Sequence, residues 1–545
     1  MRLEPSSHVD SFCRDNLPPP EQMPAIDLAG VAEVAAYPKR MNCAAELLDK
    51  RAAAHPERLA FSSERESLTY GELRARADRI AHVLRDDLGI RPGNRVLLRS
   101  ANNPAYVACW YAVQKVGGVV VATMPMLRAR ELATIADLAR IEVALCDLRL
   151  RAEMDLTLGR AATLKRIMYF GGGDLDAAAA KKPERFETHD TSADDVCLIA
   201  FTSGTTGPPK GAMHFHRDIL AMCDTVSRYV VRPRPDDVFV GSPPIAFTFG
   251  LGVQVSFPMH AGAASHLIET PSPEALLGAI QARQASILAT APTMYRAMLP
   301  LLGKYDLRSL RTCVSAGEHL PLATFKAWRE ATGIRIVDGL GSTEMLHIFV
   351  SAAGDDIRPG ATGRAIPGYR ARVVDEHGNE VPLGTIGRLA VQGPTGCKYL
   401  ANPEKQRQYV RDGWNYPGDA YLQDKDGYLF YQARTDDLIV SAGYNISGPE
   451  VETAMLEHPK VLECAVIGAP DAERGQIVKA FVVLKASAEA GEAMAKALQD
   501  HVKATIAPYK YPRAVAFVDS LPKTATGKLQ RFVLREKEWA GAKKA

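Results

Sequence analysis

The sequence predicts an α/β protein with a large N-terminal domain of parallel strand–helix layers, a β-rich subdomain and a small α+β C-terminal domain. The 545 residues exceed what one hydrophobic core supports, so at least two domains are expected. Helical and strand patterns alternate from residue 41 to about 338, as is typical of parallel α/β layers. After about residue 364, short strands separated by Gly, Pro and Asp turns replace this rhythm.

The N-terminal elements follow from local patterns. Residues 1–40 are rich in Pro and polar residues, and we expect an irregular arm. Apolar residues recur at helical spacing in residues 44–55 and 69–88, and Thr69 with Glu72 predicts a capping box at the start of the second helix. Residues 95–99 and 119–122 have the composition of strands. The apolar stretch 108–127 is interrupted by polar residues and glycines, which favours a buried helix leading into a strand over a membrane span.

The C-terminal third has a different organisation. Residues 371–374 and 387–392 are expected to form strands of the β-rich subdomain. A polar, glycine-containing segment at 434–447 then precedes about a hundred residues of mixed α+β character, in which a helix is expected around 486–497. We therefore predict three parts: the arm (1–40), an N-terminal domain (41–435) and a C-terminal domain (436–545).

Composition limits the possible partners and locations. The 66 basic and 63 acidic residues give a formal charge of +3, which is too small an excess of positive charge to indicate a nucleic-acid-binding protein. Nine scattered cysteines without a C-x-x-C pair predict neither a zinc ribbon nor a disulfide framework. With no apolar signal at the N-terminus, a cytoplasmic protein without a membrane partner is expected. His214 and His216 alone are weak evidence for a metal, and both a monomer and a homodimer stay open.

One loop carries most of the functional information. Residues 202–211 (TSGTTGPPKG) follow a strand-like run at 196–201. Small residues let the backbone curl and direct N–H groups at an anion, hydroxyl groups add donors, and Lys210 adds positive charge. It is not a Walker A loop, because Pro208 and Pro209 separate Lys210 from the preceding glycine and Gly211 follows it. The loop therefore predicts a polyphosphate site.

This loop resembles the phosphate loop of the adenylate-forming superfamily, which holds acyl-CoA synthetases, luciferases and peptide-synthetase adenylation domains. Three further segments follow in the family's order and spacing: 338–344 (DGLGSTE), 414–419 (WNYPGD) with Arg434 downstream, and 522–528 (PKTATGK). Two departures stand out: residues 338–340 (DGL) replace the commoner aromatic lead-in, and Pro417 lies where threonine is common. Residues 315–319 (SAGEH) resemble the segment that packs against adenine.

The resemblance implies specific site residues. Thr343, Glu344 and Lys528 would be catalytic; Thr343 would bond the α-phosphate, Glu344 would hold Mg²⁺, and Lys528 would stabilise the anionic transition state. Asp419 would bind the ribose hydroxyls. The implied ATP site comprises Thr202, Ser203, Gly204, Thr205, Thr206, Lys210, Ala316, Gly317, Glu318, Asp338, Gly339, Thr343, Asp419 and Arg434.

The resemblance also implies two half-reactions. A carboxylate attacks the α-phosphate of MgATP to give an acyl-adenylate and pyrophosphate. The mobile C-terminal domain then rotates about Asp436, and a loop with Gly443 and Tyr444 lines the tunnel through which coenzyme A reaches the adenylate. Transfer to a carrier protein, luciferase-like oxygenation and non-catalytic nucleotide binding are the alternatives. The presence of Glu344, Asp419 and Lys528 disfavours the last.

The acid is expected to be aromatic. Residues 341–349 (GSTEMLHIF) resemble benzoate-type aryl-CoA ligases, and the arm at 7–19 resembles that of 2-aminobenzoate-CoA ligases. We therefore expect 2-aminobenzoate first and benzoate second, with short- and medium-chain aliphatic acids still open. The phenylalanines at 247 and 249 either form an aromatic wall or belong to the core, and the histidine at 347 is either a core residue or a pocket residue. The implied acyl pocket consists of Phe247, Phe249, Gly250, Ala316, Gly341, His347 and Ile348.

Overall fold

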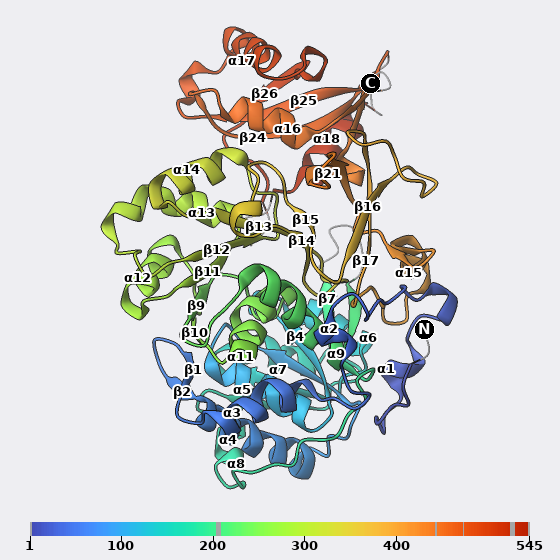
Figure 1. Ribbon diagram of the computed structural model, residues 1–545, viewed down its shortest axis with the longest axis vertical. Helices are drawn as coiled ribbons and strands as arrows, with labels where there is room; N and C mark the ends of the chain where they lie inside the picture. Colours follow the sequence, from blue (N-terminus) through green and yellow to red (C-terminus); the bar gives the residue numbers. More distant parts are fainter. Residues whose placement is uncertain (1–2, 203–208, 442–443, 472, 524–528, 543–545) are drawn as a thin grey trace.

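The computed structural model describes residues 3–202, 209–441, 444–471, 473–523 and 529–542. Figure 1 shows two large sheets with their helices in the lower and middle parts of the molecule, a β-rich part at the right and a small C-terminal body at the top. The arrangement is of the α/β class predicted from the sequence, with mixed sheets and helices in a large N-terminal and a small C-terminal unit.

The first sheet has the order β6-β5-β3-β4-β7-β8. All neighbours are parallel except β7 and β8, which are antiparallel and are joined by residues 203–209. Every residue of β3, β4 and β5 is buried, which is the pattern of parallel strands covered on both faces. Its strands are β3 (Arg95–Arg99), β4 (Val119–Thr123), β5 (Val143–Asp147), β6 (Arg166–Phe170), β7 (Val196–Thr202) and β8 (Lys210–Phe215).

The second sheet has the order β15-β14-β13-β12-β11-β9-β10-β1-β2. Its centre is parallel and its edge strands β2, β14 and β15 are antiparallel. Thus β1 and β2, which come first in the chain, lie at the edge of the second sheet. The strands are β1 (Leu59–Ser62), β2 (Ser67–Thr69), β9 (Val238–Gly241), β10 (Ala264–Leu267), β11 (Ile287–Thr290), β12 (Thr312–Ala316), β13 (Ile336–Gly341), β14 (Ile348–Ser351) and β15 (Arg364–Ala365).

The β-rich part and the C-terminal body contain three further sheets. The β-rich sheet is antiparallel, and two of its strands match those predicted at 371–374 and 387–392. In the C-terminal body, β24 and β25 are antiparallel and β26 is parallel to β25. The strands are β16 (Arg370–Val374), β17 (Ile386–Gln392), β18 (Val410–Arg411), β19 (Trp414–Asn415), β20 (Asp419–Gln423), β21 (Leu429–Arg434), β22 (Ile439–Ser441), β23 (Tyr444–Ile446), β24 (Val461–Asp471), β25 (Gly475–Leu484) and β26 (Ala514–Phe517).

Helices flank all of these sheets. The predicted capping box is confirmed, because Thr69 Oγ1 accepts from Glu72 N–H at 3.2 Å and the Glu72 carboxylate accepts from Thr69 N–H at 2.8 Å. The helices are α1 (Phe12–Asp15), α2 (Ala32–Ala35), α3 (Lys50–Ala54), α4 (Tyr70–His82), α5 (Pro104–Lys115), α6 (Ala129–Leu138), α7 (Arg151–Leu158), α8 (Asp174–Ala179), α9 (His216–Met222), α10 (Thr248–Leu251), α11 (Phe257–Ala261), α12 (Pro273–Arg283), α13 (Pro292–Met298), α14 (Leu322–Thr332), α15 (Pro403–Tyr409), α16 (Gly448–Leu456), α17 (Glu492–Thr505) and α18 (Arg531–Ala542).

The main core joins the two large sheets. It contains Val96 and Val120 from the first sheet, Phe239 and Ile287 from the second, and Trp110 of the wholly buried helix α5. The predicted buried helix leading into a strand is thus α5 followed by β4. Within the described part of the chain, no helix combines the length and apolar character needed to span a lipid bilayer.

The N-terminal arm is packed against the body and contains the short helices α1 and α2, which the sequence prediction of an irregular arm missed. Cys13 of α1 is fully buried, and Asp10 forms an ion pair with Arg95 of β3. Glu4 N–H donates to Asp194 Oδ2 at 2.8 Å, just before β7. The arm thereby supports the strand that leads into the predicted phosphate loop.

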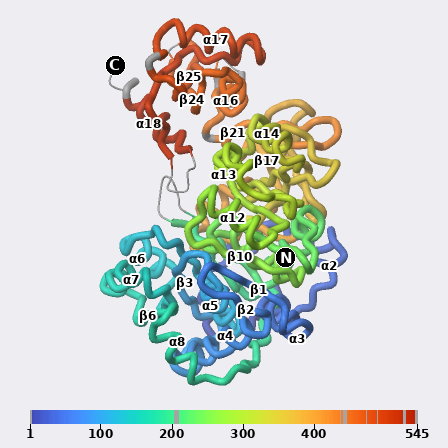
Figure 2. Tube along the Cα trace, turned by 90° about the vertical axis from the view of Figure 1, so that its left-hand side faces the viewer, coloured from blue at the N-terminus to red at the C-terminus, as the bar shows by residue number. Residues whose placement is uncertain are grey.

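The C-terminal body lies above the second sheet and the β-rich part. Figure 2 shows it as a separate body above the rest of the chain, with α18 on the side facing the large domain. The short 3-10 helix at Thr435–Asp437 lies between β21 of the β-rich sheet and β22. The predicted boundary near Asp436 falls in this connection and stays a prediction.

Candidate active site

A cavity of about 350 Å³ lies between the large domain and the C-terminal body. On the large-domain side its walls come from the ends of β12, β13, β20 and β21, and on the other side from α16, β24 and the start of α18. Seven residues predicted from the sequence line it: Gly317, Glu318, Asp338, Gly339, Gly341, Asp419 and Arg434. The fold therefore brings segments about 120 residues apart to one cleft.

Asp419 and Arg434 form a fixed pair in this cleft. Arg434 Nη1 donates to Asp419 Oδ1 at 3.0 Å and to the Pro417 carbonyl at 2.8 Å. Burial by itself would lower the pKa of Arg434, but the Asp419 carboxylate raises this pKa above its usual value. Gly418 has φ +84°, and a Cβ there would lie 2.6 Å from Arg434 Nη2. The positive φ favours glycine here, and a Cβ would in addition displace the guanidinium from its present position.

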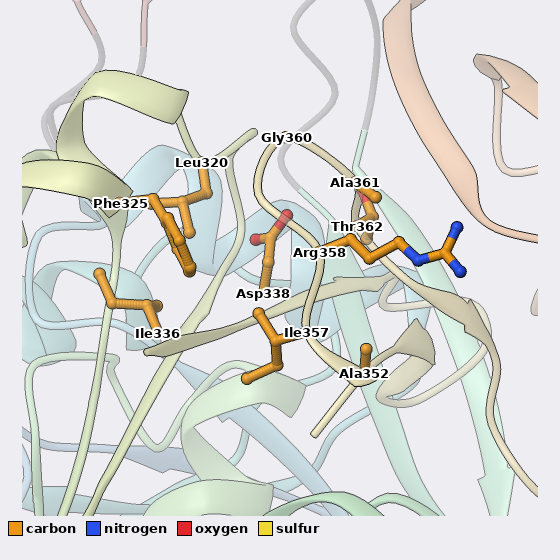
Figure 3. Close-up of a pocket in the computed structure, with 10 residues that line it drawn as sticks. All are labelled: Leu320, Phe325, Ile336, Asp338, Ala352, Ile357, Arg358, Gly360, Ala361 and Thr362. Carbon is orange, nitrogen blue, oxygen red and sulfur yellow. The ribbon is translucent and has the colours of Figure 1, made fainter. Parts of the chain in front are cut away.

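Asp338 occupies an unusual environment for a carboxylate. It lines a small hollow of about 10 Å³. Figure 3 shows its carboxyl group with Leu320, Phe325 and Ile336 on one side and Ile357 nearby. Burial raises the pKa of Asp338 to about 8, although hydrogen bonds from Gly339 N–H and the Thr362 hydroxyl act in the opposite direction. Asp338 is therefore mostly protonated at neutral pH, and its carboxyl group offers both a donor and an acceptor to the cleft.

Two aromatic residues meet in the cleft: His319, which ends the predicted segment 315–319, and Tyr431, which sequence reasoning missed. Their rings are stacked, with centroids 5.0 Å apart and an interplanar angle of 23°. Burial, and then the charge of Arg531, lower the pKa of His319 to about 4, so the ring is neutral. Leu340 also lines the cleft, and this stacked pair supplies aromatic surface where the sequence lacks the common aromatic lead-in.

The ends of the predicted phosphate loop are placed side by side. Thr202 ends β7 and Lys210 begins β8, and the two are register neighbours in the antiparallel pair. Both side chains are half-buried. Ser203, Gly204, Thr205 and Thr206 lie outside the described residues, so their phosphate contacts stay a prediction.

Glu344 is held by a tyrosine that the sequence did not single out. Tyr399 Oη donates to Glu344 Oε1 at 2.6 Å. Tyr399 is placed by a bridge to Ala212 of β8, which links this carboxylate to the strand after the phosphate loop. Glu344 and the adjacent Thr343 are half-buried. A half-buried carboxylate is a hard oxygen ligand of the kind that Mg²⁺ prefers, so the residues present fit that ion.

The predicted mobile elements are only partly placed. Lys528 and Gly443 lie outside the described residues. Asp436 lies within the 3-10 helix at Thr435–Asp437 and Tyr444 begins β23. Lys523 and Leu529, on either side of residues 524–528, form an antiparallel bridge and both line the cleft.

The predicted acyl-pocket residues divide into two groups. Gly341 lines the cleft, whereas Ala316, Gly250 and Ile348 are buried and are not among the residues that line it. His347 lies between two phenylalanines, with ring centroids 5.7 Å from Phe249 and 4.7 Å from Phe257. Phe247 and Phe249 are half-buried, and Phe249 packs against the main core.

The backbone is strained at Leu346, immediately before His347. Leu346 is buried and has φ +71°, a left-handed conformation that is uncommon for a leucine and that is often found at functional sites. His347 Nε2 donates to the Phe249 carbonyl at 3.4 Å. Nδ1 is then an acceptor, and among the described residues it has no hydrogen-bond partner. Burial lowers the pKa of His347 to about 3, so the ring stays neutral.

A buried cluster of Cys43, Cys197 and His216 lies away from the cleft. The His216 Nδ1 accepts from Cys43 N–H at 3.1 Å and lies 3.3 Å from Cys43 Sγ. The lone pair of this nitrogen is therefore already used to bind the backbone N–H at the helical residue Cys43. His214, on β8, is fully buried, and burial lowers its pKa to about 3.

Sequence comparison now identifies the family. The pattern of the AMP-binding enzyme family matches residues 48–399, and that of the AMP-binding enzyme C-terminal domain matches residues 450–528. The chain belongs to the AMP-binding enzyme family. Both matched segments contribute residues to the cleft, which agrees with a nucleotide site between the two units.

Individual relatives of this family cover nearly the whole chain. The benzoate–CoA ligase of Thauera aromatica is 37% identical over 507 residues, which are 91% of this chain and 96% of the relative. The 4-hydroxybenzoate–CoA/benzoate–CoA ligase of Rhodopseudomonas palustris is 34% identical, over 92% and 95%. The crystal structure of the anthranilate CoA ligase AuaEII in complex with anthranoyl-AMP has a TM-score of 0.88 and 34% identity, over 93% and 99%.

These matches confirm the predicted enzyme class. The protein is an AMP-forming acid–thiol ligase that uses ATP and coenzyme A. The alternatives of a luciferase-like enzyme and of a non-catalytic binding protein are thereby disfavoured.

Proposed function

We propose that the protein is an aryl-CoA ligase and that its preferred acid is 2-aminobenzoate. An aromatic acid is supported by the relatives, among which are benzoate and anthranilate CoA ligases. The observation that favours the amino-substituted ring is His347, a buried neutral imidazole with an acceptor nitrogen that lacks a partner. An unpaired buried acceptor is costly, and a ring amino group is a donor that would satisfy it.

Benzoate is the second candidate. It would fit the same aromatic surroundings of Phe249 and Phe257, but it has no donor for His347 Nδ1. The two acids therefore differ in one hydrogen bond. A neutral hydrogen bond contributes about 0.5–1.5 kcal/mol, which corresponds to a preference of about two- to twelvefold.

The first half-reaction would use the residues of the cleft. Asp419, fixed by Arg434, would accept hydrogen bonds from the ribose, and the protonated Asp338 would offer neutral hydrogen bonds to the base. The positive charge of Lys210 would face the phosphates, and Glu344 would hold Mg²⁺, which neutralises phosphate charge when bound. We assign to Lys528 the stabilisation of the pentacoordinate transition state in which the carboxylate oxygen attacks the α-phosphate and pyrophosphate leaves.

In the second half-reaction the C-terminal domain would rotate about Asp436, and Gly443 and Tyr444 would line the path of the pantetheine arm. The thiol of coenzyme A attacks the acyl carbon and AMP leaves. Lys528→Ala should therefore abolish adenylation but spare thioester formation from supplied acyl-AMP. Asp436→Pro should impair the second step, because it restricts the rotation. Equal loss of both steps in Lys528→Ala would contradict its assignment.

The test of the substrate is coenzyme A-dependent AMP release with MgATP across 2-aminobenzoate, benzoate, hydroxybenzoates, hexanoate and acetate. We expect 2-aminobenzoate to have the highest kcat/KM. His347→Phe keeps an aromatic ring and removes the acceptor, so it should lower kcat/KM for 2-aminobenzoate by about two- to twelvefold and leave kcat/KM for benzoate unchanged. The control Phe257→Leu should affect both acids alike. A preference for hexanoate or acetate would refute the aromatic assignment.

A further inference from the structure

We infer that Glu463 is a positioning residue for the adenylation half-reaction, because it joins Lys523 of the C-terminal body to Arg296 of the large domain. This inference rests on the function proposed above and adds to it a contact that favours the domain orientation needed for the first step. Glu463 lies on β24, Arg296 on α13, and Lys523 immediately before residues 524–528. All three line the nucleotide cleft.

The geometry around Glu463 is that of a shared carboxylate. Lys523 Nζ donates to both carboxylate oxygens, at 2.8 Å to Oε1 and 2.7 Å to Oε2. Arg296 Nη2 donates to Oε1 at 3.3 Å from the opposite side of the cleft. One carboxylate thus binds two cationic side chains, one from each domain.

The contact with Lys523 has a direct link to the predicted catalytic segment. Lys523 pairs with Leu529 in an antiparallel bridge, so the chain enters and leaves residues 524–528 at adjacent points of the cleft wall. On the far side of that segment, Arg531 donates to Glu452 at 3.0 and 2.6 Å, and Glu452 in turn accepts from Val466 N–H of β24 at 2.8 Å. Both flanks of the segment are therefore tied to carboxylates of the C-terminal body.

The contact with Arg296 is specific to one domain orientation. Lys523 and Glu463 belong to the same body and move together, whereas Arg296 belongs to the large domain. Any rotation of the C-terminal body that withdraws Lys523 from the cleft must separate Glu463 from Arg296. The ion pair therefore stabilises the orientation of the first half-reaction and is absent from the second. Because Arg296 is 48% exposed, the pair is screened by solvent and its effect is modest.

The kinetic test separates the two half-reactions. ATP–pyrophosphate exchange with 2-aminobenzoate or benzoate measures the first, and consumption of synthetic aroyl-AMP with coenzyme A measures the second. Arg296→Gln should lower kcat of exchange by about two- to threefold, with KM for ATP and the rate of the second step unchanged. Glu463→Gln also removes the ion pair with Lys523, so it should lower kcat of exchange by about tenfold.

Two matched variants control for general effects of removing an ion pair. Arg335 pairs with Asp355 at 3.3 Å on the large domain, and Glu450 pairs with Lys510 at 2.6 Å within the C-terminal body. Arg335→Gln and Glu450→Gln should leave both half-reactions unchanged. In the double variant Arg296→Gln/Glu463→Gln the exchange rate should equal that of Glu463→Gln, since the two residues act through one contact. Additive losses, or a raised KM for ATP, would show that Arg296 acts on the nucleotide and would overturn the inference.

A second measurement does not depend on any substrate. All nine native cysteines are buried, so dyes can be attached to Arg308→Cys on the large domain and Lys496→Cys on α17. Energy transfer between the dyes should show that most parent molecules have one domain orientation. Arg296→Gln should reduce the fraction of molecules in that orientation, and Arg335→Gln should leave it unchanged. An unchanged distribution, or equal loss of both half-reactions, would refute the inference. If the parent protein forms no AMP with any aryl acid, the proposed function fails, while energy transfer still decides the domain contact.

Discussion

Replacing Asp338 with asparagine removes a buried ionisable group at constant size. In the folded protein burial raises the pKa of Asp338 to about 8, whereas in the unfolded chain the value returns to the ordinary 3.8. Between these two values the unfolded state binds fewer protons than the folded state. The free energy of unfolding of the parent protein therefore falls as pH rises through this window and is constant above it.

The size of the effect follows from the width of the window. Each pH unit corresponds to about 1.36 kcal/mol, so the largest cost of burying this group is about 6 kcal/mol above pH 8 and about 4 kcal/mol at pH 7. These are upper limits, because Asp338 also faces the cleft. Asparagine does not titrate, so Asp338→Asn should be more stable than the parent protein, and the difference should widen with pH.

Urea-induced unfolding at about pH 5.5, 7 and 8.5 measures this difference. We expect the gap in unfolding free energy to grow by up to about 3 kcal/mol from the lowest to the highest pH. Asp519→Asn, at an exposed position, is the control and should show a constant gap. In parallel, KM for ATP of the parent protein should rise above about pH 8, while that of Asp338→Asn should not. A stability gap that is independent of pH would refute the reasoning.

Three further substitutions test other parts of the structure. Lys398 Nζ lies 3.0 Å from the carboxylate of the fully buried Asp218, so Lys398→Met removes this partner and should lower the free energy of unfolding in urea by about 3 kcal/mol. Recovery of stability in Lys398→Met/Asp218→Asn would confirm the cause, and an unchanged unfolding free energy in Lys398→Met would contradict it. Tyr399→Phe removes the hydrogen bond to Glu344 and should raise the Mg²⁺ concentration for half-maximal rate by about tenfold, with the KM of the acid unchanged. Thr69→Ala removes the N-cap of α4 and should lower the free energy of unfolding by about 1 kcal/mol, measured by thermal unfolding. Thr134→Ala is the control, because the Thr134 hydroxyl bonds to a carbonyl within its own helix, and an equal loss of stability in this variant would argue against capping.

Local elements and the nucleotide motifs could be predicted from the sequence because their signals are short in range. The capping box at Thr69 and Glu72, the buried helix α5 and the strands β16 and β17 each follow from spacing within a few residues. The order of strands could not be predicted. β1 and β2 precede every strand of the first sheet, and yet β1 pairs with β10 of the second sheet and β2 pairs with β1 at its edge, because pairing between distant strands is decided by packing and not by the local pattern.

The site shows the same division. The residue types of the phosphate loop, Glu344, Asp419 and Arg434 are fixed by the chemistry of binding a nucleotide, so the sequence alone indicated them and, with them, the enzyme class. The stacking of Tyr431 on His319 of the predicted segment 315–319 and the hydrogen bond from Tyr399 to Glu344 had no sequence signal. Their partners lie between 55 and 112 residues apart, and only the folded sheets bring them together.

What the sequence determined by itself is which groups are available: the phosphate-binding loop, the carboxylates and the order of the motifs. What the tertiary structure decided is the state and the environment of those groups. Asp338 is an ordinary carboxylate in the chain and becomes a neutral donor only where Leu320, Phe325 and Ile357 exclude water from it. Glu463 becomes a link between two domains only where Arg296 and Lys523 meet it. Desolvation and pairing depend on neighbours that are remote in sequence, and for that reason they required the fold.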